Sequence, residues 1–217
     1  MSPLWIIRSV MALLLASSTW NSVAQESQTL YMNDLQSAEL DKVPDELLVL
    51  DGAFVVKEQQ NNRFLELPGA PLDSFGLLFG PTESEGIAAS ARVFGLAKGR
   101  RAPTFAVGVN GAGGYRLQVS PAKNLIELYR GDVAKTNQPF RWQSGQWTHL
   151  KIQVLKSGSA WEIRGKVWMA GTPEPSDWLI RTEETQELPP GRAAIFGSPY
   201  AGTPIRFDDL TVVRAPK

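Results

Sequence analysis

Residues 147–154 (WTHLKIQV) and 161–168 (WEIRGKVW) alternate apolar and polar side chains, and these two segments decide how the chain folds. Residues 156–159 (KSGS) lie between them as a turn signal, so the two segments predict a β-hairpin. We expect Leu155 to lie opposite Ala160, because this pairing brings both alternations into step. A slip of one residue would mix the apolar and polar sets, and the pattern itself therefore disfavours such a slip.

The predicted hairpin has two unlike faces. The apolar face needs another layer to pack against, and it collects Leu150, Ile152, Val154, Trp161, Ile163 and Val167. The polar face places Trp147 opposite Trp168, His149 opposite Lys166, Lys151 opposite Arg164, and Gln153 opposite Glu162. Two indoles, a histidine and a basic strip are unusual on a surface that only needs to be soluble. This polar face is therefore the first candidate binding surface.

A second hairpin is predicted from residues 115–119 and 125–130. Pairing Val119 with Asn124 places Tyr115, Leu117, Ile126 and Leu128 on the apolar side. Arg116 then faces Glu127 on the outer side, a cross-strand pair worth a few tenths to about 1 kcal/mol. Two hairpins that are apolar on one side only are typical of two packed sheets.

The rest of the chain also consists of short β-rich runs separated by turns rich in Gly, Pro, Asn and Asp. This spacing predicts an all-β antiparallel sandwich or barrel. A short helix over residues 34–41 and an irregular loop over residues 171–190 are the expected exceptions. The further expected strands are residues 46–50, 53–57, 63–67, 75–79, 87–94, 104–109, 193–196 and 205–213.

The first 24 residues have the composition of a secretory signal peptide. Arg8 is followed by the short apolar core of residues 9–16, and residues 22–24 (SVA) form a small-x-small cleavage site before Gln25. The apolar run is too short to favour an uncleaved anchor, because a membrane-spanning helix needs about 20 apolar residues. The sequence therefore predicts an exported chain with one domain over residues 25–217 and no membrane span after cleavage.

Charge and cysteine content restrict the function and the location. Residues 1–24 contain one of the 22 basic residues and none of the 22 acidic residues, so cleavage leaves a net charge of −1. Such a balance gives no reason to expect a nucleic-acid partner, which would need a concentrated basic excess. The chain has no cysteine and thus no disulfide, which suits the bacterial periplasm or a bacterial secreted protein.

Several segments together resemble the concanavalin A-like lectin/glucanase superfamily. Residues 46–56 (ELLVLDGAFVV) are similar to its early strand, Asp-Gly turn and strand, and residues 205–212 (IRFDDLTV) are similar to its closing strand. The two hairpins resemble the central strands of these domains. The nearest subgroups are bacterial 3-keto-disaccharide hydrolase-like domains and laminin-G-like domains.

The resemblance implies a two-sheet jelly-roll sandwich that binds saccharides on a concave face or at its rim loops. It also implies a structural calcium ion near the first and last strands, for which Asp209 is the candidate ligand. An Asp at this position that only caps a turn is the alternative. No other cofactor is expected.

The motifs of several catalytic classes are missing from the sequence. There is no Glu-x-Asp-x-x-Glu strand of the retaining glucanases on this fold, no Gly-x-Ser-x-Gly elbow, no cysteine and only one histidine. An enzyme would need a convergent acid and base, for which His149, Glu127 and Glu162 are the candidates. Because the catalytic motifs above are missing, we expect no catalytic residues.

The candidate ligand-binding residues all come from the polar face of the first hairpin. Indole rings stack on the C–H faces of sugars while basic and amide groups bind the hydroxyls. The predicted set is Trp147, Trp168, His149, Lys151, Arg164 and Lys166, with Trp142, Trp161 and Trp178 as structural residues. Ser90 and Arg92, and also Arg116 and Glu127, are expected to share this face.

Three functions stay open at this point. The first is a carbohydrate-binding or structural domain without catalysis. The second is a glycoside hydrolase that acts on a 3-keto-disaccharide or a related disaccharide. The third is a laminin-G-like module with a protein partner.

Overall fold

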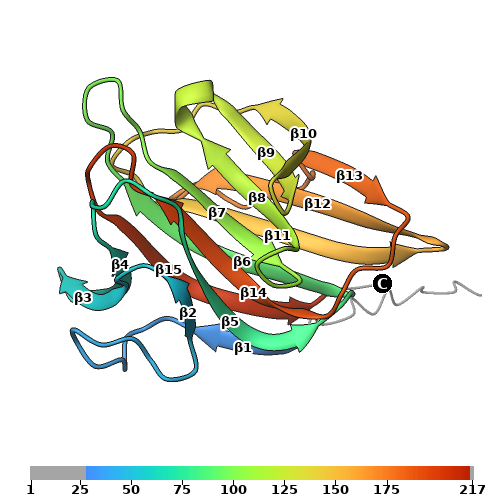
Figure 1. Cartoon of the computed structure of the whole chain (residues 1–217), viewed down its shortest axis with the longest axis horizontal. Coiled ribbons are helices and arrows are strands. Elements are labelled where there is room, and N and C mark those ends of the chain that lie inside the picture. Colours follow the sequence, from blue (N-terminus) through green and yellow to red (C-terminus); the bar gives the residue numbers. More distant parts are fainter. Residues whose placement is uncertain (1–27, 216–217) are drawn as a thin grey trace, which may run out of the picture.

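The computed structural model describes residues 28–215, which form two antiparallel sheets packed face to face (Figure 1). The predicted signal peptide, residues 1–24, lies outside the described residues. Within residues 28–215, no helix is long and apolar enough to cross a membrane. The architecture is the predicted all-β jelly-roll sandwich.

Sheet A contains the first and last described strands, and Figure 1 shows β1 beside β15. Its order is β13 (Ile180–Glu184), β12 (Ala160–Met169), β11 (Thr148–Ser157), β6 (Ile87–Gly95), β15 (Ile205–Arg214), β4 (Asn62–Leu67) and β3 (Val55–Gln59), with β1 (Thr29–Asn33) on β15.

Sheet B is the second layer. Its order is β10 (Val133–Pro139), β9 (Leu125–Arg130), β8 (Tyr115–Ser120), β7 (Thr104–Val109), β14 (Gly191–Ser198), β5 (Phe75–Glu83) and β2 (Leu48–Asp51).

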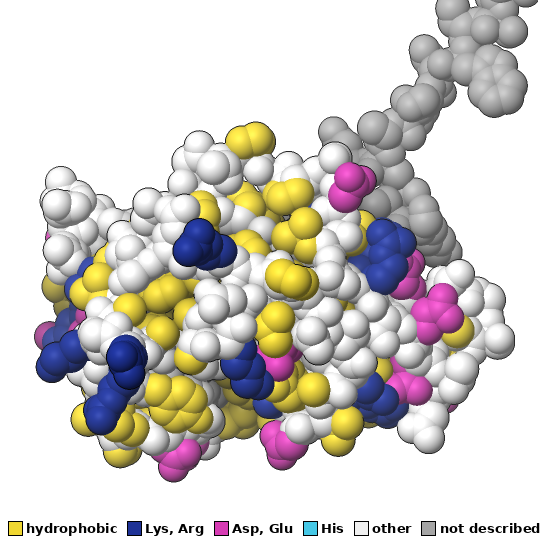
Figure 2. All heavy atoms as spheres, turned by 90° about the horizontal axis from the view of Figure 1, so that it is seen from above, with side chains coloured by type: hydrophobic (Ala, Val, Ile, Leu, Met, Phe, Trp, Pro, Cys, Tyr) yellow, Lys and Arg dark blue, Asp and Glu magenta, His cyan; other side chains and the backbone are white. Residues whose placement is uncertain are grey.

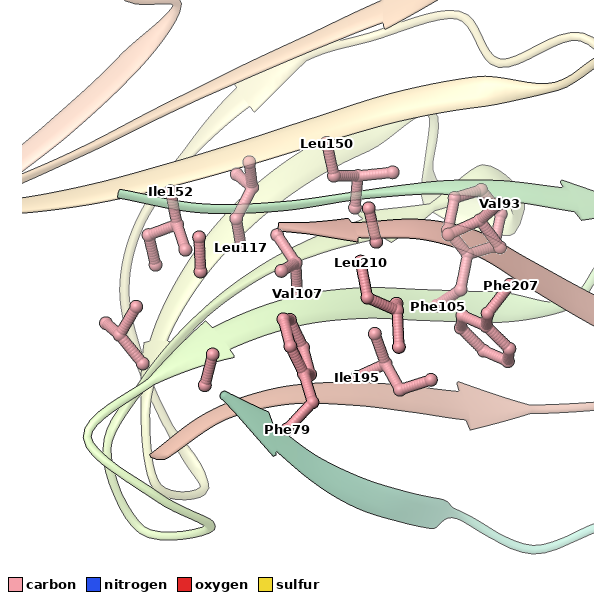
Figure 3. Close-up of a cluster of buried hydrophobic side chains, with 14 of the residues drawn as sticks. Phe79, Val93, Phe105, Val107, Leu117, Leu150, Ile152, Ile195, Phe207 and Leu210 are labelled. Carbon is pink, nitrogen blue, oxygen red and sulfur yellow. The ribbon is translucent and has the colours of Figure 1, made fainter. Parts of the chain in front are cut away.

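The core lies between the sheets and is filled by the inward side chains of both. Figure 3 shows Phe79, Val107 and Ile195 of sheet B together with Leu150 and Leu210 of sheet A. All six residues of the predicted apolar hairpin face are buried. Burial of apolar area is the main stabilising contribution of such a layer pair.

The register of the first hairpin differs from the prediction by two residues. His149 pairs with Trp168, and Ser157 pairs with Ala160 instead of Leu155 with Ala160. The turn is therefore two residues long, with Gly158 at φ 63° in the first central position, which matches the twist of the flanking strands better than a four-residue loop. Because side chains alternate with period two, this even shift preserves both faces.

The second hairpin shows the same displacement. Ser120 pairs with Leu125, and Arg116 faces Tyr129 instead of Glu127. A 3-10 turn over Pro121–Lys123 and the left-handed Asn124 (φ 56°) close the loop, a conformation that Asn tolerates well. The apolar side of this hairpin is buried as predicted.

Two expected exceptions were wrong in part. Residues 34–41 form turns, and the described residues contain no α-helix. These turns place Leu35 in the core, fully buried, with φ 62°. The expected loop over residues 171–190 contains β13, which pairs with the edge of β12.

Candidate binding surfaces on the two outer faces

The outer face of sheet A carries the predicted polar strip. Arg92 pairs with His149 and Ser90 pairs with Lys151 across β6 and β11, which confirms that Ser90 and Arg92 share this face. The outer face of sheet B carries Arg116 and Glu127 instead, so the expectation for this second pair was wrong. Sequence alternation gives the face of a strand but not the sheet to which the strand belongs.

His149 and Trp168 form a stacked pair at the centre of the strip. Their ring centroids lie 5.0 Å apart with an interplanar angle of 10°. Burial lowers the pKa of His149 below its usual value, and the nearby charge of Arg92 lowers it further. The imidazole is therefore neutral at pH 7, which suits a flat contact with an indole.

The segment between β12 and β13, residues 170–179, lies over part of the strip. The Glu174 carboxylate accepts hydrogen bonds at 3.1 Å from Nζ of Lys151 and of Lys166. Lys166, only 6% exposed, also donates to the backbone oxygen of Pro175 at 2.5 Å. The ammonium groups of the strip are thus paired within the chain.

Trp178 extends this cover over the next basic residue. The Arg164 guanidinium lies 4.6 Å from the Trp178 ring centroid, and Lys166 Nζ lies 4.8 Å from it. Arg164 Nε also donates to the Gln153 side chain at 2.8 Å. Lys151, Arg164 and Lys166 therefore hold residues 170–179 against the sheet.

Trp147 lies apart from this covered region. It is not the cross-strand partner of Trp168, because the register places His149 there. Its ring centroid is 5.6 Å from that of Phe94 and 6.3 Å from that of Phe64, and the Arg92 guanidinium lies 4.7 Å above it. Trp147 thus belongs to a second aromatic group over β6 and β4.

A hollow of about 320 Å³ lies over this aromatic group, which we call the Trp147 hollow. Its volume is at the lower end of the range of small-ligand sites. Sequence reasoning missed most of its residues, because the order β6–β15–β4, which brings them together, cannot be read from alternation. It is lined by Gln59, Gln60, Asn62, Phe64, Arg92, Phe94, Trp147 and Arg206.

Arg92 is fixed on one side of the hollow by carboxylates and an amide. Its Nη2 donates to Asp208 Oδ2 at 2.6 Å and to Asn62 Oδ1 at 3.1 Å. Its Nε lies 2.8 Å from Asp209 Oδ2 as an ion pair outside hydrogen-bond geometry. Asp208 is fully buried, and burial raises its pKa although Asn62 and Arg92 oppose this shift.

The ion pair between Asp209 and Arg92 affects whether Asp209 can bind the calcium ion that the resemblance implied. Asp209 neutralises Arg92 and occupies a bulge in β15 with φ 51°. Residues 28–215 contain no group of three His, Cys, Asp or Glu side chains that could hold a metal ion. Calcium prefers six to eight oxygen ligands, and the surroundings of Asp209 do not fit one.

On the outer face of sheet B, Glu127 is buried in a hydrogen-bonded cluster. Its carboxylate accepts from Ser120 Oγ at 2.5 Å, from Lys123 Nζ at 3.1 Å and from the Tyr129 hydroxyl at 3.2 Å. Burial alone would raise the pKa of Glu127, but the hydrogen bonds from Ser120 and Lys123 outweigh it and hold the pKa below its usual value. Glu127 is therefore a fixed carboxylate.

The three acid/base candidates do not converge. Glu127 lies on sheet B, whereas His149 and Glu162 lie on sheet A. Glu162 pairs with Leu155, six residues along β11 from His149, which corresponds to about 20 Å. No substrate atom can lie within hydrogen-bond distance of two of them.

Charge is not concentrated on the face that Figure 2 shows. Basic, acidic and apolar side chains are interspersed there, and the histidine is not visible on it. This face has no basic patch of the kind that nucleic acids need.

Comparison with solved structures assigns the fold. The carbohydrate-binding module CBM66 from Bacillus subtilis is similar at 12% identity and a TM-score of 0.53, over 77% of this chain and 94% of that one. The Emp46p carbohydrate recognition domain in its metal-free form is similar at 12% identity and a TM-score of 0.56, over 87% of this chain and 97% of that one.

A third neighbour has a bound sugar. It is domain 4 of AbnA, an extracellular family GH43 arabinanase from Geobacillus stearothermophilus, in complex with arabinotriose. The similarity is 14% identity and a TM-score of 0.50, over 88% of this chain and 94% of that one. The chain matches no protein-family model, and no curated protein matches its sequence. The chain thus has the concanavalin A-like lectin/glucanase fold, while the subgroup stays a prediction.

Proposed function

We propose that this chain is an exported, non-catalytic saccharide-binding domain of the bacterial periplasm or cell exterior. The Trp147 hollow is the observation that carries the proposal. It combines an indole, three amide side chains and two guanidinium groups around about 320 Å³. Aromatic surface with a few fixed polar groups is the usual composition of small-ligand sites.

The charges around the hollow favour a neutral ligand there. Arg92 is balanced by Asp208 and Asp209, and Arg206 is paired with Glu66 at 3.2 Å. Guanidinium groups that are already paired still present N–H donors of fixed direction. Hydroxyl groups of a neutral sugar match such donors and the amides of Gln59 and Gln60.

The predicted strip contributes to this site in two ways. Trp147 stacks on the sugar ring, and the His149–Trp168 pair extends the surface next to Arg92. Lys151, Arg164 and Lys166 act indirectly, because they hold residues 170–179 beside the site.

The test is calorimetric titration of the protein with neutral trisaccharides of glucose, galactose and arabinose. Loss of a buried aromatic anchor costs about 2 kcal/mol, so Trp147→Ala should weaken binding about 30-fold. Gln60→Asn, which tolerates the local φ of 54°, should weaken it less and leave folding unchanged. Gln138→Ala on the exposed edge strand β10 is the matched control.

Two results would contradict the proposal. No binding of any of the three neutral trisaccharides by the folded protein would favour a protein partner of the laminin-G-like kind for the Trp147 hollow. Turnover of a disaccharide or its 3-keto form, measured as released monosaccharide, would show a hydrolase. Export predicts a secreted form that begins at Gln25, which N-terminal sequencing checks.

A further inference from the structure

A second pocket lies on the opposite face of the molecule, over sheet B. It encloses about 370 Å³ where β7, β8 and β14 meet the 3-10 turn after β8, and we call it the Arg116 pocket. Its polar lining includes Ser74, Thr104, Arg116, Tyr129, Ser198 and Tyr200. None of these residues belongs to the Trp147 hollow, so the two surfaces are independent of each other.

Arg116 lies over two aromatic rings. Its guanidinium carbon lies 4.7 Å from the Tyr129 ring centroid and 5.7 Å from that of Phe196. The nearest carboxylate is that of Asp132, at 3.8 Å, on a fully exposed side chain. A cation–π contact uses the π face of a ring and leaves the N–H donors of the guanidinium for an acceptor.

The hydrogen bonding of Arg116 is unlike that of its counterparts. Among residues 28–215, each other arginine that is not exposed donates a side-chain hydrogen bond within the chain, for example Arg92, Arg164 and Arg206. Arg116 donates none there. Lys123, the other cation of the pocket, is already paired with Glu127 at 3.1 Å.

The rest of the pocket presents hydroxyl groups. Ser74 Oγ lies 2.8 Å from Ser198 Oγ and 3.5 Å from the Tyr200 hydroxyl. Tyr200 is 46% exposed, so it is accessible from solvent. Hydroxyls that both donate and accept, beside aromatic rings, suit a polyhydroxylated ring.

We propose that the Arg116 pocket binds a hexuronate residue of an acidic saccharide. The guanidinium of Arg116 pairs with the carboxylate through its two parallel N–H donors, a geometry that guanidinium and carboxylate share. The Ser74, Ser198 and Tyr200 hydroxyls bind the ring hydroxyls. The two outer faces then recognise different sugars, neutral on sheet A and acidic on sheet B.

The experiment titrates the protein with trimers of galacturonate, of galactose and of 6-sulfated galactose. We expect the galacturonate trimer to bind, and Arg116→Gln to weaken this binding at least 10-fold. Arg116→Lys keeps the charge without the planar fork, so its loss should be smaller. Arg181→Gln, an exposed arginine of β13 on the other sheet, should change nothing.

Each alternative outcome overturns the proposal in a recognisable way. Galactose binding that Arg116→Gln weakens as strongly as it weakens galacturonate binding would show that the pocket does not recognise the carboxylate. Binding of the sulfated trimer alone would assign a different anion. Absence of galacturonate binding, or unchanged binding in the folded Arg116→Gln and Arg116→Lys variants, would exclude the pocket.

The outcome also separates this proposal from the Trp147 hollow. Trp147→Ala should leave galacturonate binding unchanged, whereas Arg116→Gln should leave neutral-sugar binding unchanged. Loss of galacturonate binding in Trp147→Ala with retention in Arg116→Gln would place the acidic sugar on sheet A. Thermal unfolding of each variant checks that it remains folded.

Discussion

Replacing Glu184 with glutamine tests how the two sheets are joined at their β13 edge. Glu184 of sheet A accepts a hydrogen bond from the buried Tyr115 hydroxyl at 2.9 Å and pairs with Arg130, both of sheet B. Its other oxygen accepts from the backbone N–H groups of Thr185 and Gln186. Burial alone would raise the pKa of Glu184, but these hydrogen bonds and Arg130 lower it to about 2.

The magnitude follows from this pKa. A shift from 4.5 in the unfolded chain to about 2 corresponds to about 3 kcal/mol of stability at pH 7. Water around the partly exposed Arg130 screens part of the interaction, so we expect Glu184→Gln to cost about 2 to 3 kcal/mol. The contribution is complete above pH 4.5 and is lost as the pH falls through about 2.

The assay is urea unfolding at pH 7 and at pH 2, with Glu183→Gln as control because Glu183 is the exposed neighbour on the same strand. The difference between wild type and Glu184→Gln should shrink to below about 1 kcal/mol at pH 2. An equal difference at both pH values would show that the shape of the side chain matters, not its charge, and would refute the reasoning.

Three further predictions follow from single positions. Gly165→Ala should destabilise by about 1 to 3 kcal/mol, because the new Cβ would lie 2.8 Å from Leu117 Cδ1, and chemical denaturation measures this; an unchanged midpoint would contradict the packing. Asp208→Ala should lower the free energy of unfolding by about 3 kcal/mol, because it removes the buried partner of Arg92. Asp209→Ala removes a half-exposed partner and should lower it much less. Equal losses in the two variants would contradict this ion-pair network. His149 should titrate below pH 6.5 by NMR, so its contribution to stability is lost as the pH falls below that value, and a higher pKa would refute the buried stack with Trp168.

The faces of the strands could be predicted from the sequence, but the registers could not. Leu150, Ile152 and Val154 are buried as the alternation predicts, yet both central hairpins pair two residues away from the expected register. A shift of two residues keeps every side chain on its face, so the hydrophobic pattern cannot detect it. The turn decides it, through Gly158 in one hairpin and Asn124 in the other.

The composition of the edge strands β10 and β13 does not indicate strand structure. In β10, six of the seven residues are exposed, and β13 lies in a segment rich in charge and proline, so neither shows the apolar period of a buried strand. Their pairing depends on the neighbouring strand more than on their own side chains. The composition of residues 171–190 therefore predicts a loop, although β13 lies within this segment.

The candidate sites depend on strand order and on loop position. Trp147 and Arg92 were found because they alternate with apolar residues, but Asn62 and Arg206 join them only through the order β6–β15–β4. Glu174 and Trp178 occupy the basic strip because residues 170–179 fold back over it. Short-range sequence patterns predict neither the strand order nor the position of residues 170–179.

The central claim is that the Trp147 hollow binds a neutral saccharide, and NMR mapping of the indole Nε1–H signals tests it most directly. On titration with the neutral trisaccharide that binds best, the Trp147 signal should shift with saturation while that of the core residue Trp161 stays in place. Saturable binding that leaves the Trp147 signal unmoved would contradict the claim.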